Sequence, residues 1–237
     1  VTGANFIVAE TGTIVLVTNE GNGRMCTTLP DVHVAIAGID KIVPDWNSLA
    51  TLLPMLVRNA TGQKLSCCTS FITGARRSDG QGPREFHLVL LDNGRSRILQ
   101  DESARETLLC IRCGACANIC PVYNHVGGFA YGTIFLGPIG SIVAPQLLGT
   151  KIAGDLPFAS SLCGACADVC PVKIPIPEIL LHLRQRVVEG DRFEKPVASP
   201  ILNASARVGA TSLSTPWLYR FGARMLRSMQ SPFRHGD

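Results

Sequence analysis

The feature that most constrains this chain is a pair of matched cysteine blocks. The first block runs from Cys110 to Pro121 and has the spacing C-x2-C-x2-C-x3-C-P. The second block runs from Cys163 to Pro171 and repeats the end of that spacing, C-x2-C-x3-C-P. Seven of the ten cysteines lie in these two blocks. Thiolates spaced in this way on tight turns reach neighbouring corners of a small cubane, so the blocks predict iron–sulfur ligation.

Two other uses of cysteine fit the blocks less well. A zinc site pairs two C-x2-C hairpins and needs neither a third cysteine nor the C-x3-C-P ending. A disulfide framework suits a short secreted chain, whereas this sequence of 237 residues shows no signal-peptide pattern. Ten cysteines without a secretory leader indicate a reducing compartment, and we expect the protein to be cytoplasmic.

In two-cluster proteins the fourth cysteine of each run ligates the other cluster. This rule assigns cluster 1 to Cys110, Cys113, Cys116 and Cys170, and cluster 2 to Cys120, Cys163 and Cys166. Where the first block has Cys110, the second has Ser160, so cluster 2 lacks one thiolate. We predict that cluster 1 is [4Fe-4S]. Cluster 2 is then either [3Fe-4S] or a [4Fe-4S] centre whose last iron carries Ser160, water or a substrate. An electron-relay centre is favoured over an open Lewis-acid iron.

Composition narrows the functions further. The net charge is +4 and 17% of the residues are charged, which is not the profile of a nucleic-acid-binding protein. Residues 126–150 carry no charge and are numerous enough to span a membrane. Six glycines and two prolines interrupt that segment, and a spanning helix could not satisfy a backbone broken so often. We expect the segment to wrap over the clusters instead.

Residues 1–97 show strand and helix patterns in alternation. Strands are predicted at 5–9, 13–17, 32–37, 65–72 and 86–91, and residues from Arg24 are predicted to return as a strand pairing with 13–17. A helix is predicted from Asp45 to Gly62, with a kink or break at Pro54. This alternation indicates a mostly parallel sheet covered by helices.

Residues 98–190 form the predicted helical domain that holds the clusters. A capping-box pattern at Ser103–Glu106 predicts a helix that leads into Cys110, and residues 178–189 predict a second helix. Residues 191–237 form a third part, a loose strap followed by a basic amphipathic helix at 217–229. This helix is a candidate for peripheral contact with a membrane, and docking on its own protein or on a partner subunit is the alternative.

The remaining residues carry little chemistry. We expect Cys26, Cys67 and Cys68 to be buried as small apolar side chains. No nucleophile comes with a recognisable base, and no flavin or nicotinamide fingerprint is present, so no catalytic residue is identified.

Both parts of the chain resemble one known family, lactate utilization protein B. In the cluster region the resemblance rests on Cys110–Tyr123, His125–Gly128, Ala130–Gly132, Gly137–Gly140, Ser160–Cys166 and Cys170–Pro175. In the N-terminal region it rests on Thr2–Asn5, Ala9–Gly12, Thr18–Arg24, Thr27–Pro30 and Leu91–Arg95, which look like the later half of a LUD domain. The family has a longer N-terminal region, so the chain looks like a member without that part. Cys67 and Cys68 replace residues that are usually not cysteine.

The resemblance implies an α/β LUD domain similar to the NagB/RpiA/CoA-transferase group, followed by an α-helical ferredoxin-like two-cluster domain. It implies a cytoplasmic iron–sulfur protein that acts with two companion proteins to oxidise L-lactate to pyruvate, with the same seven cysteines as ligands. We therefore expect an electron-transfer subunit whose electron acceptor is unknown. The alternatives are an iron–sulfur subunit of another dehydrogenase or heterodisulfide-reductase-like complex, and a LUD ligand-binding protein with structural clusters.

Overall fold

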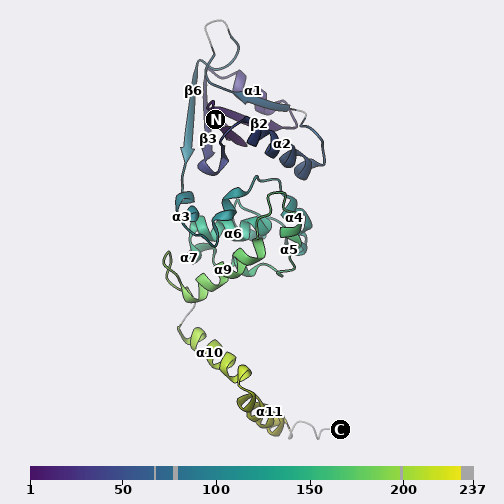
Figure 1. Cartoon of the computed structure of the whole chain (residues 1–237), viewed down its shortest axis with the longest axis vertical. Helices are drawn as coiled ribbons and strands as arrows, with labels where there is room; N and C mark the ends of the chain where they lie inside the picture. Colours follow the sequence, from purple (N-terminus) through teal and green to yellow (C-terminus); the bar gives the residue numbers. More distant parts are fainter. Residues whose placement is uncertain (67, 77–79, 198–199, 231–237) are drawn as a thin grey trace. The chain divides into compact units, whose positions relative to one another are not determined.

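The structure is a computed structural model that describes residues 1–66, 68–76, 80–197 and 200–230 (Figure 1). Packing divides the chain into two units, residues 1–184 and 185–237, and each is described by itself. The first unit starts with strands and continues with helices, which confirms the predicted α/β part followed by a helical part. The domain boundaries at 97 and 190 remain predictions.

In the part of the chain that the structure describes, six strands form two sheets. The larger sheet has the order β4 (Ile42–Val43), β1 (Phe6–Val8), β2 (Thr13–Thr18) and β5 (Cys68–Ile72). β3 (Val32–Gly38) and β6 (Glu85–Leu91) form a separate parallel pair. In the larger sheet β2 is antiparallel to both β1 and β5, so the prediction of a mostly parallel sheet is wrong. The reason is that only residues 9–12 connect β1 to β2, and so short a link permits a hairpin but no crossover.

The return strand predicted from Arg24 is also wrong. That segment forms α1 (Asn22–Thr28), because β2 already has β1 and β5 on its two edges and offers no free edge. α1 buries Thr27 and leaves Cys26 exposed, so the expected burial of Cys26 is not found. Cys68 is half-buried at the start of β5, and Cys67 lies outside the described residues.

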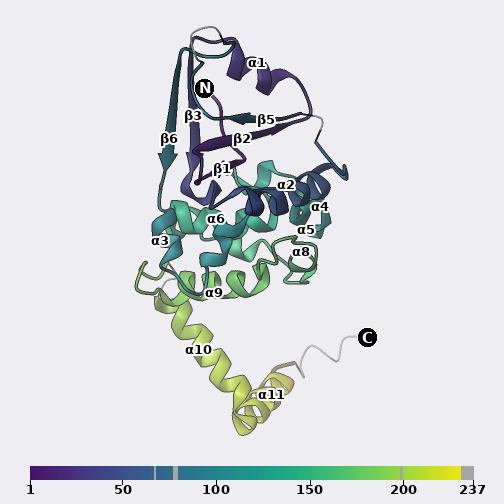
Figure 2. The same cartoon turned by 45° about the horizontal axis from the view of Figure 1, so that its top comes forward.

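α2 (Trp46–Thr61) confirms the predicted helix. The Asp45 carboxylate accepts the N–H of Ser48 at 2.8 Å, and Gly62 ends the helix with φ 74°. The helix continues through Pro54 without the expected break. Pro54 lies on the exposed side, where the carbonyl group that lost its N–H partner can bond to water. Figure 2 shows α2 running beside the larger sheet.

The helical part of the first unit is built from short elements. They are α3 (Arg95–Leu99), η2 (Arg105–Leu109), α4 (Ala115–Ile119), α5 (Pro121–Val126), η3 (Phe129–Tyr131), α6 (Gly137–Leu148), α7 (Thr150–Ala153), η4 (Leu156–Phe158) and α8 (Ala165–Asp168). The predicted capping-box helix is only the 3₁₀ turn η2, because Ser103 donates its own N–H to Asp101 and gives η2 no side-chain cap.

Segment 126–150 contributes Phe135 and Ile139 to the cavity of the cysteine blocks, as a segment that wraps over the clusters would, and its second half is the helix α6. Nearly every residue of α6 is buried, and the helix is apolar all round, which is typical of a core helix. No helix among the described residues is long and apolar enough to cross a membrane.

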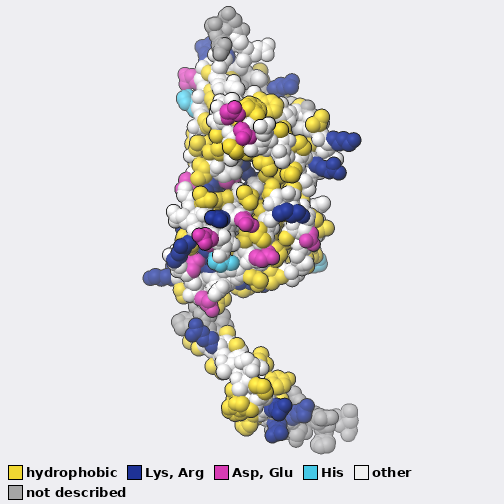
Figure 3. Space-filling model, viewed as in Figure 1, with side chains coloured by type: hydrophobic (Ala, Val, Ile, Leu, Met, Phe, Trp, Pro, Cys, Tyr) yellow, Lys and Arg dark blue, Asp and Glu magenta, His cyan; other side chains and the backbone are white. Residues whose placement is uncertain are grey.

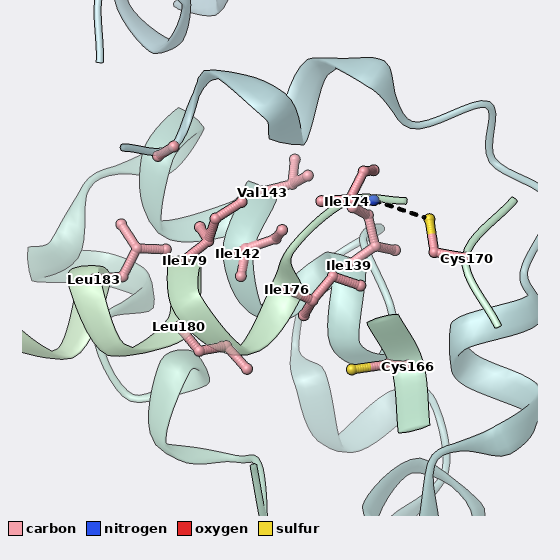
Figure 4. Close-up of a cluster of buried hydrophobic side chains, with 11 residues drawn as sticks. Ile139, Ile142, Val143, Cys166, Cys170, Ile174, Ile176, Ile179, Leu180 and Leu183 are labelled. Atoms are coloured by element: carbon pink, nitrogen blue, oxygen red, sulfur yellow. Dashed lines mark hydrogen bonds between the residues drawn. The ribbon is translucent and has the colours of Figure 1, made fainter. Parts of the chain in front are cut away.

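The core of the helical part joins α6 to α9 (Ile176–Glu189), which confirms the helix predicted at 178–189. Ile142 of α6 and Leu180 and Leu183 of α9 are completely buried, and Cys166 and Cys170 belong to the same apolar cluster (Figure 4). The second cysteine block is therefore anchored directly to the core.

The second unit contains the end of α9, then α10 (Pro200–Ser214) and α11 (Pro216–Gln230). α11 confirms the predicted amphipathic helix, whereas the predicted loose strap is largely the helix α10. Pro200 and Pro216 stand at first helical positions, and residues 201–215 contain no proline, so nothing interrupts α10. Figure 3 shows apolar and basic side chains together along these helices, and Trp217 and Phe221 are exposed.

Candidate iron–sulfur site

The two cysteine blocks have the same backbone conformation. Arg112 and Leu162, which precede Cys113 and Cys163, have φ values of 63° and 55°. The glycines that follow those cysteines, Gly114 and Gly164, have φ values of 80° and 86° and begin the short helices α4 and α8. Left-handed residues on both sides turn each cysteine sharply before the helix. The repeated sequence thus forms a repeated structure.

The first block and the last cysteine of the second block surround one cavity. Cys110, Cys113, Cys116 and Cys170 line a cavity of about 270 Å³, together with apolar side chains such as Phe135 and Ile139. No three His, Cys, Asp or Glu side chains of the described chain converge closely enough to hold a single metal ion. Four sulfurs spread around a cavity fit a multi-iron cluster, whose corners are separate iron atoms.

Backbone N–H groups point at the sulfur atoms. Three of them donate at 3.4 Å: Arg112 to Cys110, Tyr123 to Cys120, and Ile174 to Cys170. The bond to Cys170 is drawn in Figure 4. Such donors stabilise the negative charge of a thiolate and of a cluster bound through it. The donor set, the cavity and these N–H groups together fit an iron–sulfur cluster.

Burial favours the protonated form of two cavity thiols. It raises the pKa of Cys110, and it raises the pKa of Cys116 to about 12. Cys163 differs because it is exposed, and the N–H of Ala165 lowers the pKa of its thiol. Thiols with a raised pKa are protonated at neutral pH, and iron must displace those protons when it binds.

The other three cysteines lie close to one another. Burial raises the pKa of Cys166, and the nearby charges of Cys163 and Cys120 raise it further. The helices α4 and α8, which carry Cys116 and Cys166, are in contact. Cys120 of the first block and Cys163 of the second block therefore both lie near Cys166.

Ser160 occupies the place that corresponds to Cys110. The Cys110 sulfur accepts the N–H of Arg112, two residues along the chain, and the Ser160 hydroxyl oxygen accepts the N–H of Leu162 at 3.2 Å in the same way. The backbone of Ser160 is held by Arg184, whose guanidinium donates to its carbonyl oxygen at 3.0 Å. The two residues therefore share a local turn, with a hydroxyl in place of a thiol.

The sheet supports the first block. Ile111 is buried among Phe6, Val15 and Leu56, and Cys113 packs against the same cluster. Lys41, between β3 and β4, donates to the carbonyl oxygen of Cys110 at 3.1 Å. Sequence reasoning missed this contact, since the only signal is a charged pair, Asp40–Lys41, within an apolar stretch.

Family comparisons agree with this division of the chain. Residues 1–91 match the LUD domain, and residues 106–174 match the 4Fe-4S dicluster domain. No solved structure matches. The fold and the cysteine blocks, together with these matches, define the class as an iron–sulfur protein in which a LUD domain precedes a dicluster domain.

Curated relatives specify the family. "Lactate utilization protein B" of Geobacillus thermodenitrificans is 48% identical over 98% of this chain and 48% of the relative. The protein of that name from Bacillus subtilis is 46% identical over 100% of this chain and 49% of the relative. The chain belongs to the lactate utilization protein B family. It spans about half the length of the curated relatives that it matches.

Proposed function

We propose that this chain is the electron-transfer part of a cytoplasmic complex that oxidises L-lactate to pyruvate. Its partners would be companion lactate-utilization subunits, and its electron acceptor is a protein or carrier still to be identified. The proposal is supported by the family relationship and by two adjacent cysteine sets that suit iron–sulfur clusters. We propose that the chemical step on lactate takes place on a companion subunit.

We assign the cavity cysteines Cys110, Cys113, Cys116 and Cys170 to cluster 1, and Cys120, Cys163 and Cys166 to cluster 2. When bound, such clusters supply reversible one-electron transfer. The protein lines the first site with apolar side chains and directs N–H groups at the sulfurs. The observation that supports this proposal most directly is the contact between α4 and α8. It brings the two proposed sites close together, as electron transfer between clusters requires.

Crossed ligation can be tested with single serine variants. Cys170→Ser should alter the same EPR signal as Cys110→Ser, although the two residues lie in different blocks. Cys120→Ser should alter the other signal, together with Cys166→Ser. Cys26→Ser is the control, because Cys26 is exposed on α1, outside both blocks, and should alter neither signal. If Cys170→Ser instead alters the same signal as Cys166→Ser, or Cys120→Ser the same signal as Cys110→Ser, the crossed assignment is wrong.

Ser160 is our proposed fourth ligand of cluster 2, supported by the turn that it shares with Cys110. Ser160→Cys should then give a second cluster with ordinary four-thiolate EPR properties. Ser160→Ala should favour loss of the fourth iron and give a [3Fe-4S] signal. Identical EPR spectra for Ser160→Ala and the unaltered chain would exclude the serine ligand.

The proposed function is tested under anaerobic conditions. L-lactate is added to the chain with its clusters, first alone and then with the companion subunits, and the cluster absorbance is followed. Bleaching only in the presence of the companions is the expected result for a relay. Bleaching by the chain alone would place the chemical step here. Absence of bleaching with all subunits present would contradict the proposal.

A further inference from the structure

A largely buried cation between β3 and β4 contacts the first cysteine block. Lys41 lies in η1 (Ile39–Lys41), and its Nζ donates to the carbonyl oxygen of Cys110 at 3.1 Å, although the two residues are 69 positions apart. The side chain of Lys41 is only 14% exposed. Since a buried ammonium group requires compensating partners, its position beside the block calls for an explanation.

The partners of Lys41 leave an excess of positive charge. The Asp40 carboxylate lies 3.5 Å from the Lys41 ammonium and is also paired with Arg95. Burial lowers the pKa of Lys41, and the charge of Asp40 opposes this effect. Because one carboxylate pairs with two cations, the group of Lys41, Asp40 and Arg95 has a net charge of +1.

A second cation belongs to the block itself. Arg112 stands between Cys110 and Cys113, lines the cavity, and holds its guanidinium carbon 4.6 Å from the centre of the Phe135 ring. The charges of Arg112 and Lys41 both act on the Cys110 thiol and lower its pKa, against the larger opposing effect of burial. Both cations lie near the cavity, but Arg112 is exposed, so solvent screens its charge more than the charge of Lys41.

We propose that Lys41 and Arg112 raise the midpoint potential of the cluster held by the cavity cysteines. The inference rests on the proposed ligation by Cys110, Cys113, Cys116 and Cys170. Reduction adds one negative charge to the site, and a fixed positive charge nearby stabilises the reduced form more than the oxidised form. Lys41 contributes most effectively because little solvent screens it.

The second site has different charged neighbours. Arg184 donates to the carbonyl oxygen of Ser160 at 3.0 Å, and the charge of Asp168, of opposite sign, acts on the Cys163 thiol. Replacement of Lys41 alters neither of these neighbours. A change at Lys41 should therefore affect one cluster and leave the other unaltered.

The chain also provides a matched control. Lys173 donates to the carbonyl oxygen of Asp168 at 2.8 Å, which is the same kind of bond as that between Lys41 and Cys110. Lys173 is exposed, however, so solvent screens its charge. Comparison of the two lysines separates the effect of a buried charge from the loss of a hydrogen bond to a cysteine block.

The test is an anaerobic redox titration of the chain with both clusters, followed by EPR. Lys41→Met should lower the reduced-to-oxidised ratio of cluster 1 at a fixed potential about tenfold, a shift of about 59 mV for one electron. Lys41→Arg, which keeps the charge, should leave the cluster 1 potential close to that of the unaltered chain. Lys173→Met should shift the potential of neither cluster by more than a small fraction of about 59 mV. An unchanged cluster 1 potential in Lys41→Met at full iron content would overturn the inference.

Two further measurements keep the outcomes distinct. If Lys41→Met does not retain its iron, Lys41→Gln, which keeps a hydrogen-bond donor for the carbonyl oxygen of Cys110, provides the same test, and an unchanged potential there overturns the inference. The serine variants of Cys110 and Cys170 examine the ligand assignment independently of any potential. If those two variants affect different EPR signals, the ligand assignment in the proposed function is wrong. If they affect the same signal but the cluster 1 potential does not change in the Lys41 variants, only the proposed role of the cations is wrong.

Discussion

At the scale of single residues, the site depends on how closely α6 approaches the segment before it. A Cβ atom added at Gly140 would meet the carbonyl oxygen of Phe135 far inside van der Waals contact. Phe135 itself lines the cavity and stacks with Arg112. Glycine at this position therefore sets the distance between a buried helix and one wall of the candidate site.

Gly140→Ala should destabilise the first unit by about 1–3 kcal/mol, because overpacking must move either the helix or the Phe135 backbone. Anaerobic thermal melting followed by circular dichroism measures the effect. Gly209→Ala in α10 is the control, since an added Cβ there meets nothing within 4 Å and alanine favours a helix. Equal melting temperatures for Gly140→Ala and the unaltered chain would show that α6 can shift without cost.

At the scale of elements, α9 secures the second block. Leu180 is completely buried in the core, while its neighbour Leu181 is 54% exposed. Cys166 and Cys170 belong to the same buried cluster as Leu180. The packing of α9 and the position of these cysteines are therefore mechanically connected.

Leu180→Ala should cost about 2–5 kcal/mol of stability, because it leaves a cavity in the core. It should also accelerate the loss of cluster absorbance in air, since the packing around Cys166 and Cys170 loosens. Leu181→Ala removes the same atoms from the solvent side of the same helix and should change stability by less than about 0.5 kcal/mol. Equal effects of the two variants would contradict the proposed role of α9.

Sequence reasoning succeeded where the local pattern alone determines the element. Asp45 and Gly62 mark the two ends of α2, and the proline and glycine flanking α9 do the same. It failed where the outcome depends on distant neighbours. Residues from Arg24 form a helix because β5, which lies far along the sequence, occupies the edge of β2. The cysteine spacing pointed to the right class of site, but Lys41 could not be linked to Cys110 from spacing, because only tertiary packing brings them together.

At the scale of the whole molecule, the sheet and the cysteine blocks form one packed body. Ile111 is enclosed by side chains of β1, β2 and α2, so the first block completes a core that begins at the N-terminal sheet. The four thiols line a cavity of about 270 Å³ and make no van der Waals contacts with one another across it. The stability of the first unit should therefore depend on what fills the cavity.

Removal of iron with a chelator should lower the melting temperature of the first unit, since the bond energy of the clusters is then lost from the folded state. Reconstitution with iron and sulfide should restore it. The control is the Cys110→Ser variant, whose melting temperature should already be low and should respond less to the chelator. A melting temperature independent of iron would mean that the sheet and the helices hold the empty site without help.

The exposure of Cys163 affects which of the two clusters is damaged and repaired first. Cys170 is buried and Cys116 is half-buried, whereas Cys163, two residues before α8, is exposed. Oxygen, chelators and an iron donor all reach Cys163 before they reach the cavity. The second cluster should accordingly be the first to be damaged and the first to be repaired, so that inactivated protein accumulates as a one-cluster form that can be rebuilt without unfolding.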